Sequence, residues 1–93
     1  MQKLNPEEVQ SRLTSLPGWR IEGGELVKTF QFNDFAASLG FVNDVGELAE
    51  KAGHHPDIDI RYNRVRLGLI THDAGGLTGK DFDLAGQAQK LAG

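Results

Sequence analysis

Apolar residues recur along the chain with two different periods. Three segments have the three- and four-residue spacing of an amphipathic helix, and four short runs between them alternate as strands do. The helical segments begin at Pro6, near Asn33 and after Thr78, and the strands cover residues 19–21, 26–32, 57–62 and 65–70. This order predicts an α+β fold, α-β-β-α-β-β-α, with helices on one face of a four-stranded antiparallel sheet. With 93 residues and no linker, the chain is expected to form a single domain, residues 1–93.

The first and last helices share the same start signals. Asn5 is a predicted N-cap with Glu8 three residues later, and Thr78 is a predicted N-cap with Asp81 three residues later. Each pair has the spacing of a capping box, and Pro17-Gly18 is expected to stop the first helix. Capping alone is therefore sufficient to explain Asp81.

The long middle helix is expected to run from an N-cap at Asn33 to about Gly53. Its spacing directs one apolar stripe toward the core, made of Phe35, Leu39, Val42, Val45, Ala49 and Ala52. Phe41 and Leu48 lie outside this stripe. A second apolar face on a helix of a small protein indicates a contact with another subunit.

The first strand pair is expected to be a tight hairpin. Gly23-Gly24 favours a turn that places Ile21 opposite Leu26. Trp19 falls in step with the core positions of these strands, so we assign it to packing rather than to ligand stacking.

A second hairpin is expected around Asn63-Arg64. A two-residue turn there would pair Ile60 with Leu67 and bring His72 level with His55. A three-residue loop would shift the partners by one and reverse the faces. The two ends of the hairpin converge in either case.

Composition excludes several classes of function. The chain has no cysteine, which excludes disulfides, thiolate nucleophiles and cysteine-ligated zinc. Its net charge of −3 argues against nucleic-acid binding through phosphate neutralisation. Arg61, Arg64 and Arg66 do cluster, but Asp57 and Asp59 lie beside them on a strand face of mixed charge. No apolar run approaches the roughly 20 residues of a membrane helix, and the charged N-terminus argues against a signal peptide, so a cytoplasmic location is expected.

The most concentrated chemistry lies between Glu50 and His72. All three histidines of the chain, His54, His55 and His72, fall within nineteen residues. Pro56 holds the residue before it in an extended conformation, so the adjacent pair is expected at a corner between a helix and a strand. Imidazoles have an ordinary pKa of about 6.5 and can donate or accept a proton near neutral pH. The cluster therefore predicts general acid–base catalysis on a small substrate.

Neighbouring groups suggest roles for particular histidines. Glu50 lies four residues before His54 on the expected helix, so its carboxylate can orient this imidazole. The partial negative charge at a helix C-terminus favours protonated His54, which makes it a candidate proton donor. A zinc site built by the three histidines is the alternative. Adjacent residues in an extended segment point to opposite faces, so we expect no metal.

The spacing of these residues resembles a known family. Glu50, His54-His55-Pro56, Tyr62-Asn63, the segment Thr71-His72-Asp73-Ala74-Gly75-Gly76-Leu77-Thr78, and Asp81 are similar to the signature of pterin-4a-carbinolamine dehydratase. The order of elements agrees as well, and so does Trp19 after Pro17-Gly18. The resemblance thus covers essentially the whole chain.

The resemblance implies dehydration of 4a-hydroxytetrahydrobiopterin to quinonoid dihydropterin and water, in the recycling of tetrahydrobiopterin. It implies no metal and no organic cofactor. His54 and His72 would be the acid–base residues, and His55 would bind the substrate with a share in proton transfer. Glu50 would orient a histidine or act as a base. The residues implied in substrate binding are His54, His55, Pro56, Thr71, His72, Asp73 and Asp81.

The resemblance also sets expectations about affinity and partners. Gly53 stands where members often carry an acidic residue and Ile58 where many carry tryptophan, so pterin affinity is the property that these departures affect. A homodimer or homotetramer is expected, with no membrane and no direct nucleic-acid contact. Some family members are dimerisation partners of a transcription factor. A non-catalytic binding module of this coactivator type is therefore the alternative function.

Overall fold

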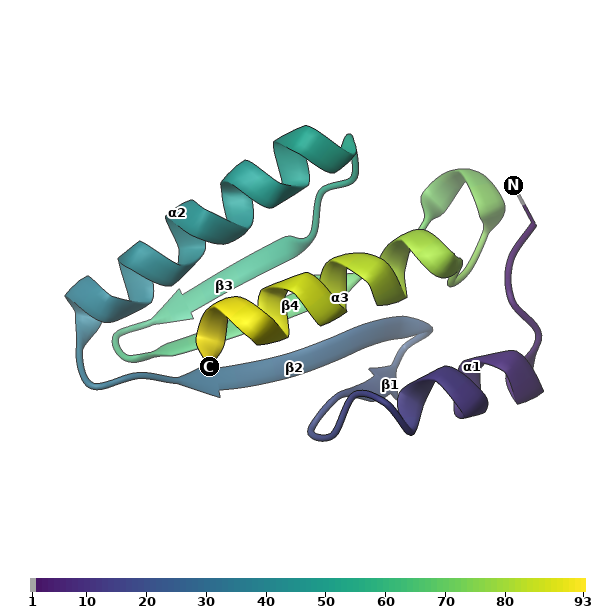
Figure 1. Cartoon of the computed structure of the whole chain (residues 1–93), viewed down its shortest axis with the longest axis horizontal. Helices are drawn as coiled ribbons and strands as arrows, with labels where there is room; N and C mark the ends of the chain where they lie inside the picture. The colour runs from purple at the N-terminus through teal and green to yellow at the C-terminus, as the bar shows by residue number, and fades with distance from the viewer. Residues whose placement is uncertain (1) are drawn as a thin grey trace.

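The computed structural model describes residues 2–93 and contains three helices and one four-stranded sheet (Figure 1). Every neighbouring pair of strands is antiparallel, and the strand order is β1-β2-β4-β3. The predicted α+β fold is therefore confirmed. In chain order the elements are α1 (Pro6–Leu13), β1 (Arg20–Glu22), β2 (Glu25–Gln31), α2 (Phe35–Ala52), β3 (Asp57–Arg61), β4 (Arg64–Leu69), a 3-10 turn (His72–Ala74) and α3 (Gly79–Ala92).

Helices α2 and α3 lie side by side over one face of the sheet, and α1 lies at the β1 end (Figure 1). Buried apolar side chains from both layers form one core, in which strand residues such as Leu26, Leu67 and Leu69 meet Val45 of α2 and Ala85 of α3. Burial of this apolar surface is the main force that holds the layers together. Within residues 2–93, none of the helices combines the length and the apolar character needed to cross a membrane.

The helix caps follow the local sequence signals closely. Asn5 and Thr78 are the N-caps of α1 and α3, each with the predicted capping box. Helix α2 begins one residue later than expected, because Asp34 rather than Asn33 is its N-cap and accepts the backbone N–H of Ala37. Gly53 ends α2 in the left-handed conformation, with φ of 62°, which glycine adopts without steric cost.

The buried stripe of α2 differs from the predicted one. Phe35 and Leu39 are 45% and 39% exposed, whereas Phe41 is buried and packs against the rings of Phe30 and Phe32 at centroid distances of 4.8 and 4.9 Å. The expectation that Phe41 makes a subunit contact is therefore wrong. The helix carries two apolar faces, and the sheet and α3 together bury the one that contains Phe41.

The two hairpins differ in how well their register was predicted. Ile21 does pair with Leu26 in the first hairpin. In the second, the turn is Tyr62-Asn63, so Ile60 pairs with Val65 rather than with Leu67. Each partner is thus displaced by two residues, an even number, and the side chains keep their predicted faces.

Trp19 occupies the core, as predicted. It is 6% exposed and packs edge-on against Phe30, with ring centroids 5.7 Å apart. Its indole Nε1–H donates to the side-chain oxygen of Gln89, at 3.1 Å, which ties the strand layer to α3. A buried indole N–H requires such an acceptor.

Candidate active site

The predicted convergence of the hairpin ends is present in the structure. The end of α2, the end of β4 and the start of α3 surround an open cavity of about 290 Å³. All three histidines line it, and the full set of lining residues is Gly53, His54, His55, Ile70, Thr71, His72, Asp73 and Lys80.

Local backbone geometry places the histidines around this cavity. The left-handed Gly53 turns the chain out of α2, and the backbone N–H of His54 still donates to the last turn of the helix, at Ala49 O, 3.2 Å away. Pro56 follows and leads into β3. On the other side, a bridge between Thr71 and Gly76 closes the short loop that carries His72.

His54 is held by a fully buried carboxylate. Its Nε2 lies 2.5 Å from Oδ1 of Asp81, and the two side chains are 12% and 0% exposed. The other carboxylate oxygen, Oδ2, accepts the hydroxyl of Thr71 at 2.8 Å and the backbone N–H of Thr78 at 2.9 Å. Asp81 is thus both the capping residue of α3 and the partner of His54.

His55 is in a different environment. Its Nε2 bonds to Oε2 of Glu50, and the two side chains are 60% and 76% exposed. The expectation that Glu50 orients His54 is therefore wrong. The helix ends at Gly53 in a left-handed conformation, so the four-residue spacing no longer places His54 above Glu50.

His72 is the third case. It is exposed on the 3-10 turn, and its ring has no hydrogen-bond partner among residues 2–93. The three imidazoles therefore differ in their partners. His54 is paired with a buried acid, His55 is paired with an exposed acid, and His72 is free to meet a ligand.

Several of the expected substrate-binding residues do not reach the cavity. Asp81 is fully buried and does not line the cavity. Its position therefore argues against the predicted direct contact with a substrate. Pro56 is absent from the lining as well. Glu50, which was expected to be catalytic, is also absent, although it is next to the cavity through His55. Thr71 lines the cavity but is only 7% exposed, and its hydroxyl is directed to Asp81.

Lys80 is the functional candidate that the sequence did not single out. It lies in the first turn of α3, directly before Asp81, and lines the cavity with His72 and Asp73. The sequence feature that could have identified Lys80 is the predicted N-cap at Thr78. A helix that begins there has Lys80 in its first turn, at the same end as Asp81.

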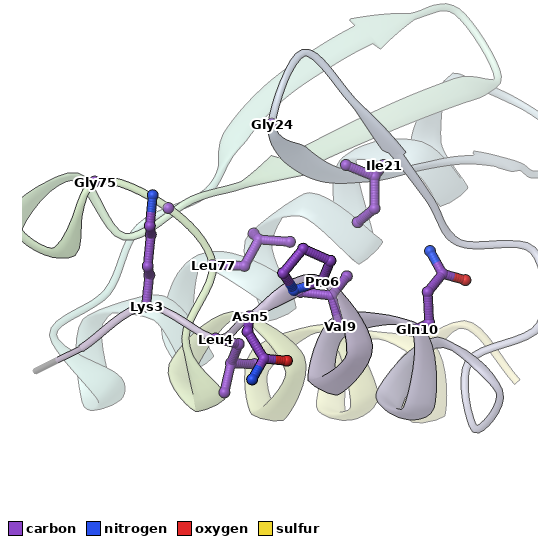
Figure 2. A pocket seen from close by; sticks show the side chains of 11 residues that line it. Lys3, Leu4, Asn5, Pro6, Val9, Gln10, Ile21, Gly24, Gly75 and Leu77 are labelled. Carbon is purple, nitrogen blue, oxygen red and sulfur yellow. The ribbon is translucent and has the colours of Figure 1, made fainter.

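Neither a metal centre nor a second acid–base cluster emerges in the part of the chain that the structure describes. No group of three or more histidine or acidic side chains in residues 2–93 is arranged to hold a metal ion. A hollow of about 580 Å³ lies between α1, the β1–β2 turn and residues 75–77, and Figure 2 shows Pro6, Val9, Ile21 and Leu77 at its centre with Lys3 to one side. Its lining has no histidine and no acidic residue, so Lys3 has no second group there with which to form an acid–base pair.

Comparisons with known proteins agree on one family. The sequence model described as pterin 4 alpha carbinolamine dehydratase matches residues 2–91. A protein of Acidobacterium capsulatum, provisionally named pterin-4-alpha-carbinolamine dehydratase, is 57% identical over 91 residues, which are 98% of this chain and 99% of the relative. A protein of Chloroflexus aurantiacus with the same provisional name is 54% identical over the full length of both chains.

Two solved structures are similar as well. The transcriptional coactivator/pterin dehydratase from Brucella melitensis superposes with a TM-score of 0.95 at 34% identity, covering 99% of this chain and 100% of its own. A pterin dehydratase-like protein described as a RuBisCO assembly factor in the alpha-carboxysome has a TM-score of 0.71 at 27% identity, covering 84% and 93%. The shared fold thus occurs in proteins with different described roles.

Proposed function

We propose, from the premise that this chain belongs to the pterin 4 alpha carbinolamine dehydratase family, that it removes water from a 4a-hydroxytetrahydropterin by histidine acid–base catalysis. The observation that supports this most strongly is the meeting of three imidazoles at one cavity, each in a different environment: His54 is paired with Asp81, His55 is paired with Glu50, and His72 is unpaired among residues 2–93. Such differences in environment allow chemically identical groups to serve as acid and as base.

The reaction requires two proton transfers. The C4a–O bond and the N5–H bond break, a C4a=N5 double bond forms, and water and the quinonoid dihydropterin are released. One group must give a proton to the departing hydroxyl while another takes the proton from N5. The transfers balance without any change in oxidation state, which suits a pair of imidazoles.

We assign the base role to His54. When an imidazole accepts a proton it becomes a cation, and a carboxylate bonded to its other nitrogen stabilises that cation, as in the Ser-His-Asp arrangement. Asp81 is placed to do this, with Oδ1 at 2.5 Å from Nε2. The role revises the hypothesis, drawn from the helix end alone, that His54 is a proton donor.

We assign the acid role to His72 and substrate binding to His55. His72 is exposed and has no side-chain hydrogen bond within residues 2–93, so it can approach the 4a-hydroxyl. His55 is held by Glu50 at the rim. Asp73 and Lys80 also line the cavity and offer opposite charges to the polar edge of a pterin.

The decisive experiment follows the loss of a freshly generated 4a-hydroxypterin by ultraviolet absorbance. We expect wild-type protein to accelerate this loss, and His54→Ala and His72→Ala each to lower the rate about 10²- to 10⁴-fold. Circular dichroism of each variant verifies folding. Equal rates for wild type, both variants and buffer would exclude the proposed activity.

The second candidate function is a binding module that assembles through α2. Phe35 and Leu39 are four residues apart on this helix and both are exposed, which leaves an apolar strip open for a partner. We propose that in this protein the strip joins copies of the chain into a homodimer or homotetramer. A stable oligomer without pterin turnover would favour the binding module over the enzyme.

A further inference from the structure

The hydroxyl of Thr71 lies at the centre of a buried hydrogen-bond chain behind the histidine cavity. It is 2.8 Å from Oδ2 of Asp81 and 2.8 Å from the hydroxyl oxygen of Thr78. A hydroxyl has one proton to donate. If Thr71 gives its proton to Asp81, the bond between the two hydroxyls must be donated by Thr78.

Thr78 is placed to donate in this direction. Its hydroxyl oxygen accepts the backbone N–H of Lys80 at 3.3 Å, and a hydroxyl that accepts there retains its own proton for Thr71. The backbone N–H of Thr78 donates separately to Oδ2 of Asp81, at 2.9 Å. All donors in the chain therefore point toward one carboxylate.

This direction determines which proton lies between Asp81 and His54. With two donors on Oδ2 and the N-terminal turn of α3 beside it, Asp81 is supported as an ionised carboxylate, which can only accept. The 2.5 Å bond from Oδ1 to His54 must then carry the proton of Nε2. A neutral imidazole protonated at Nε2 has its lone pair at Nδ1.

The remaining ring nitrogen of His54 is not buried. Nδ1 has no hydrogen-bond partner in residues 2–93, and these residues contain no buried side-chain nitrogen or oxygen atom that lacks one. Nδ1 is therefore accessible, on a residue that lines the cavity.

We infer that Thr71 is a positioning residue that acts through Asp81, and that Nδ1 of His54 is the nitrogen that exchanges a proton with the substrate. This inference rests on the proposed function for its catalytic consequence. Its structural half, the tautomer of His54, stands on the hydrogen bonds alone. It also gives Thr71 a different role from the substrate contact that the family resemblance implies.

The test compares Thr71→Val, which removes the hydroxyl and keeps the shape, with Thr71→Ser, which restores it. Ring ¹⁵N spectra of histidine-labelled protein are recorded without substrate at alkaline pH, where imidazoles are neutral. We expect wild type and Thr71→Ser to show His54 protonated at Nε2 with the same ring ¹⁵N shifts. We expect Thr71→Val to show changed ¹⁵N shifts for the His54 ring, because Asp81 loses one of the two donors that hold Oδ2. We expect kcat to fall about tenfold in Thr71→Val, with KM within twofold of wild type and Thr71→Ser near wild type in both.

Two results would overturn the inference. One is a wild-type spectrum with His54 protonated at Nδ1, and the other is a Thr71→Val protein whose His54 ring ¹⁵N shifts and kcat both match wild type. The spectra need no turnover, so a wild-type protein that failed to dehydrate any pterin would instead overturn the proposed function. Thermal unfolding of both variants separates loss of fold from loss of positioning.

Discussion

Asp81 and His54 are 27 residues apart in the sequence, yet Oδ1 of Asp81 lies 2.5 Å from Nε2 of His54. The two oxygens of this carboxylate have separate partners, because Oδ2 closes the capping box of α3 through the backbone N–H of Thr78. The side chain that begins a helix therefore also orients an imidazole at the cavity. A substitution here is expected to change stability and catalysis together.

Asp81→Asn should lower both turnover and the free energy of unfolding. An amide has only one acceptor oxygen. The N–H₂ group of Asn would therefore face either the donors of the helix cap or Nε2 of His54. We expect about 100-fold slower pterin dehydration and a loss of about 1–3 kcal/mol in the free energy of unfolding, measured by urea denaturation. Asp83→Asn, an exposed substitution two positions after Asp81 on α3, is the control and should alter stability by less than about 0.5 kcal/mol. A wild-type rate for Asp81→Asn would argue against His54 as the base.

Glu50→Gln should separate catalysis from stability. The Glu50–His55 pair is mostly exposed, and such pairs contribute at most about 1 kcal/mol. We therefore expect the midpoint of urea unfolding to change little, while KM for the pterin rises several-fold because His55 is no longer held at the rim. Glu47→Gln, one turn earlier on the same helix, is the control for loss of an exposed carboxylate. If the two variants have the same KM, Glu50 has no part in binding.

Signals that act within a few residues of the chain were sufficient to predict much of the fold. The caps at Asn5 and Thr78 depend only on side chains three residues apart, and the left-handed end of α2 depends on one glycine. Each could be predicted because no distant contact competes with it.

Predictions failed where a distant element decides between local alternatives. Helix α2 has two apolar faces, and the sheet and α3 bury the one containing Phe41. The turn of the second hairpin is fixed from outside the hairpin, because Asn63 exchanges hydrogen bonds with the backbone of Phe32 at 2.8 and 3.1 Å. The pairing of His54 with Asp81 is of the same kind. It requires α3 to pack beside α2, which no local spacing encodes.

Arg20→Ala should raise the pKa of Glu22. The side-chain hydrogen bond from Arg20, followed by the one from Arg66 at 3.2 Å, holds the pKa of this carboxyl below its ordinary value of 4.5. A carboxyl with a lowered folded-state pKa stabilises the fold above its unfolded value, and this contribution is lost as pH falls through the folded value. Titration of the Glu22 carboxyl carbon by NMR measures the change. Arg64→Ala is the control, because no bond joins Arg64 to Glu22, and added salt should reduce the shift at this exposed site.

The double substitution Phe35→Glu with Leu39→Glu tests the proposed subunit contact. Both side chains are exposed in the single chain, so charges there should leave the thermal midpoint nearly unchanged. In an apolar interface the same charges would be buried without partners, and we expect the oligomer to dissociate. Light scattering after size exclusion measures the mass. Ala37→Glu, exposed on another side of α2, is the control, and an unchanged mass for the double variant would place the contact elsewhere.

Gly53→Asp should strengthen substrate binding. Gly53 lines the cavity directly before His54 and has φ of 62°, a conformation that aspartate and asparagine tolerate better than other side chains. An acidic residue here would restore the polar contact that the family resemblance implies, and we expect KM for the pterin to fall about two- to tenfold. Gly53→Asn has the same shape without the charge and is the matched control, since any cost of the left-handed backbone is common to both. If both variants raise KM equally, the glycine serves only to end α2. A lower KM in Gly53→Asp alone would show that the cavity edge beside His54 is a contact point for the substrate.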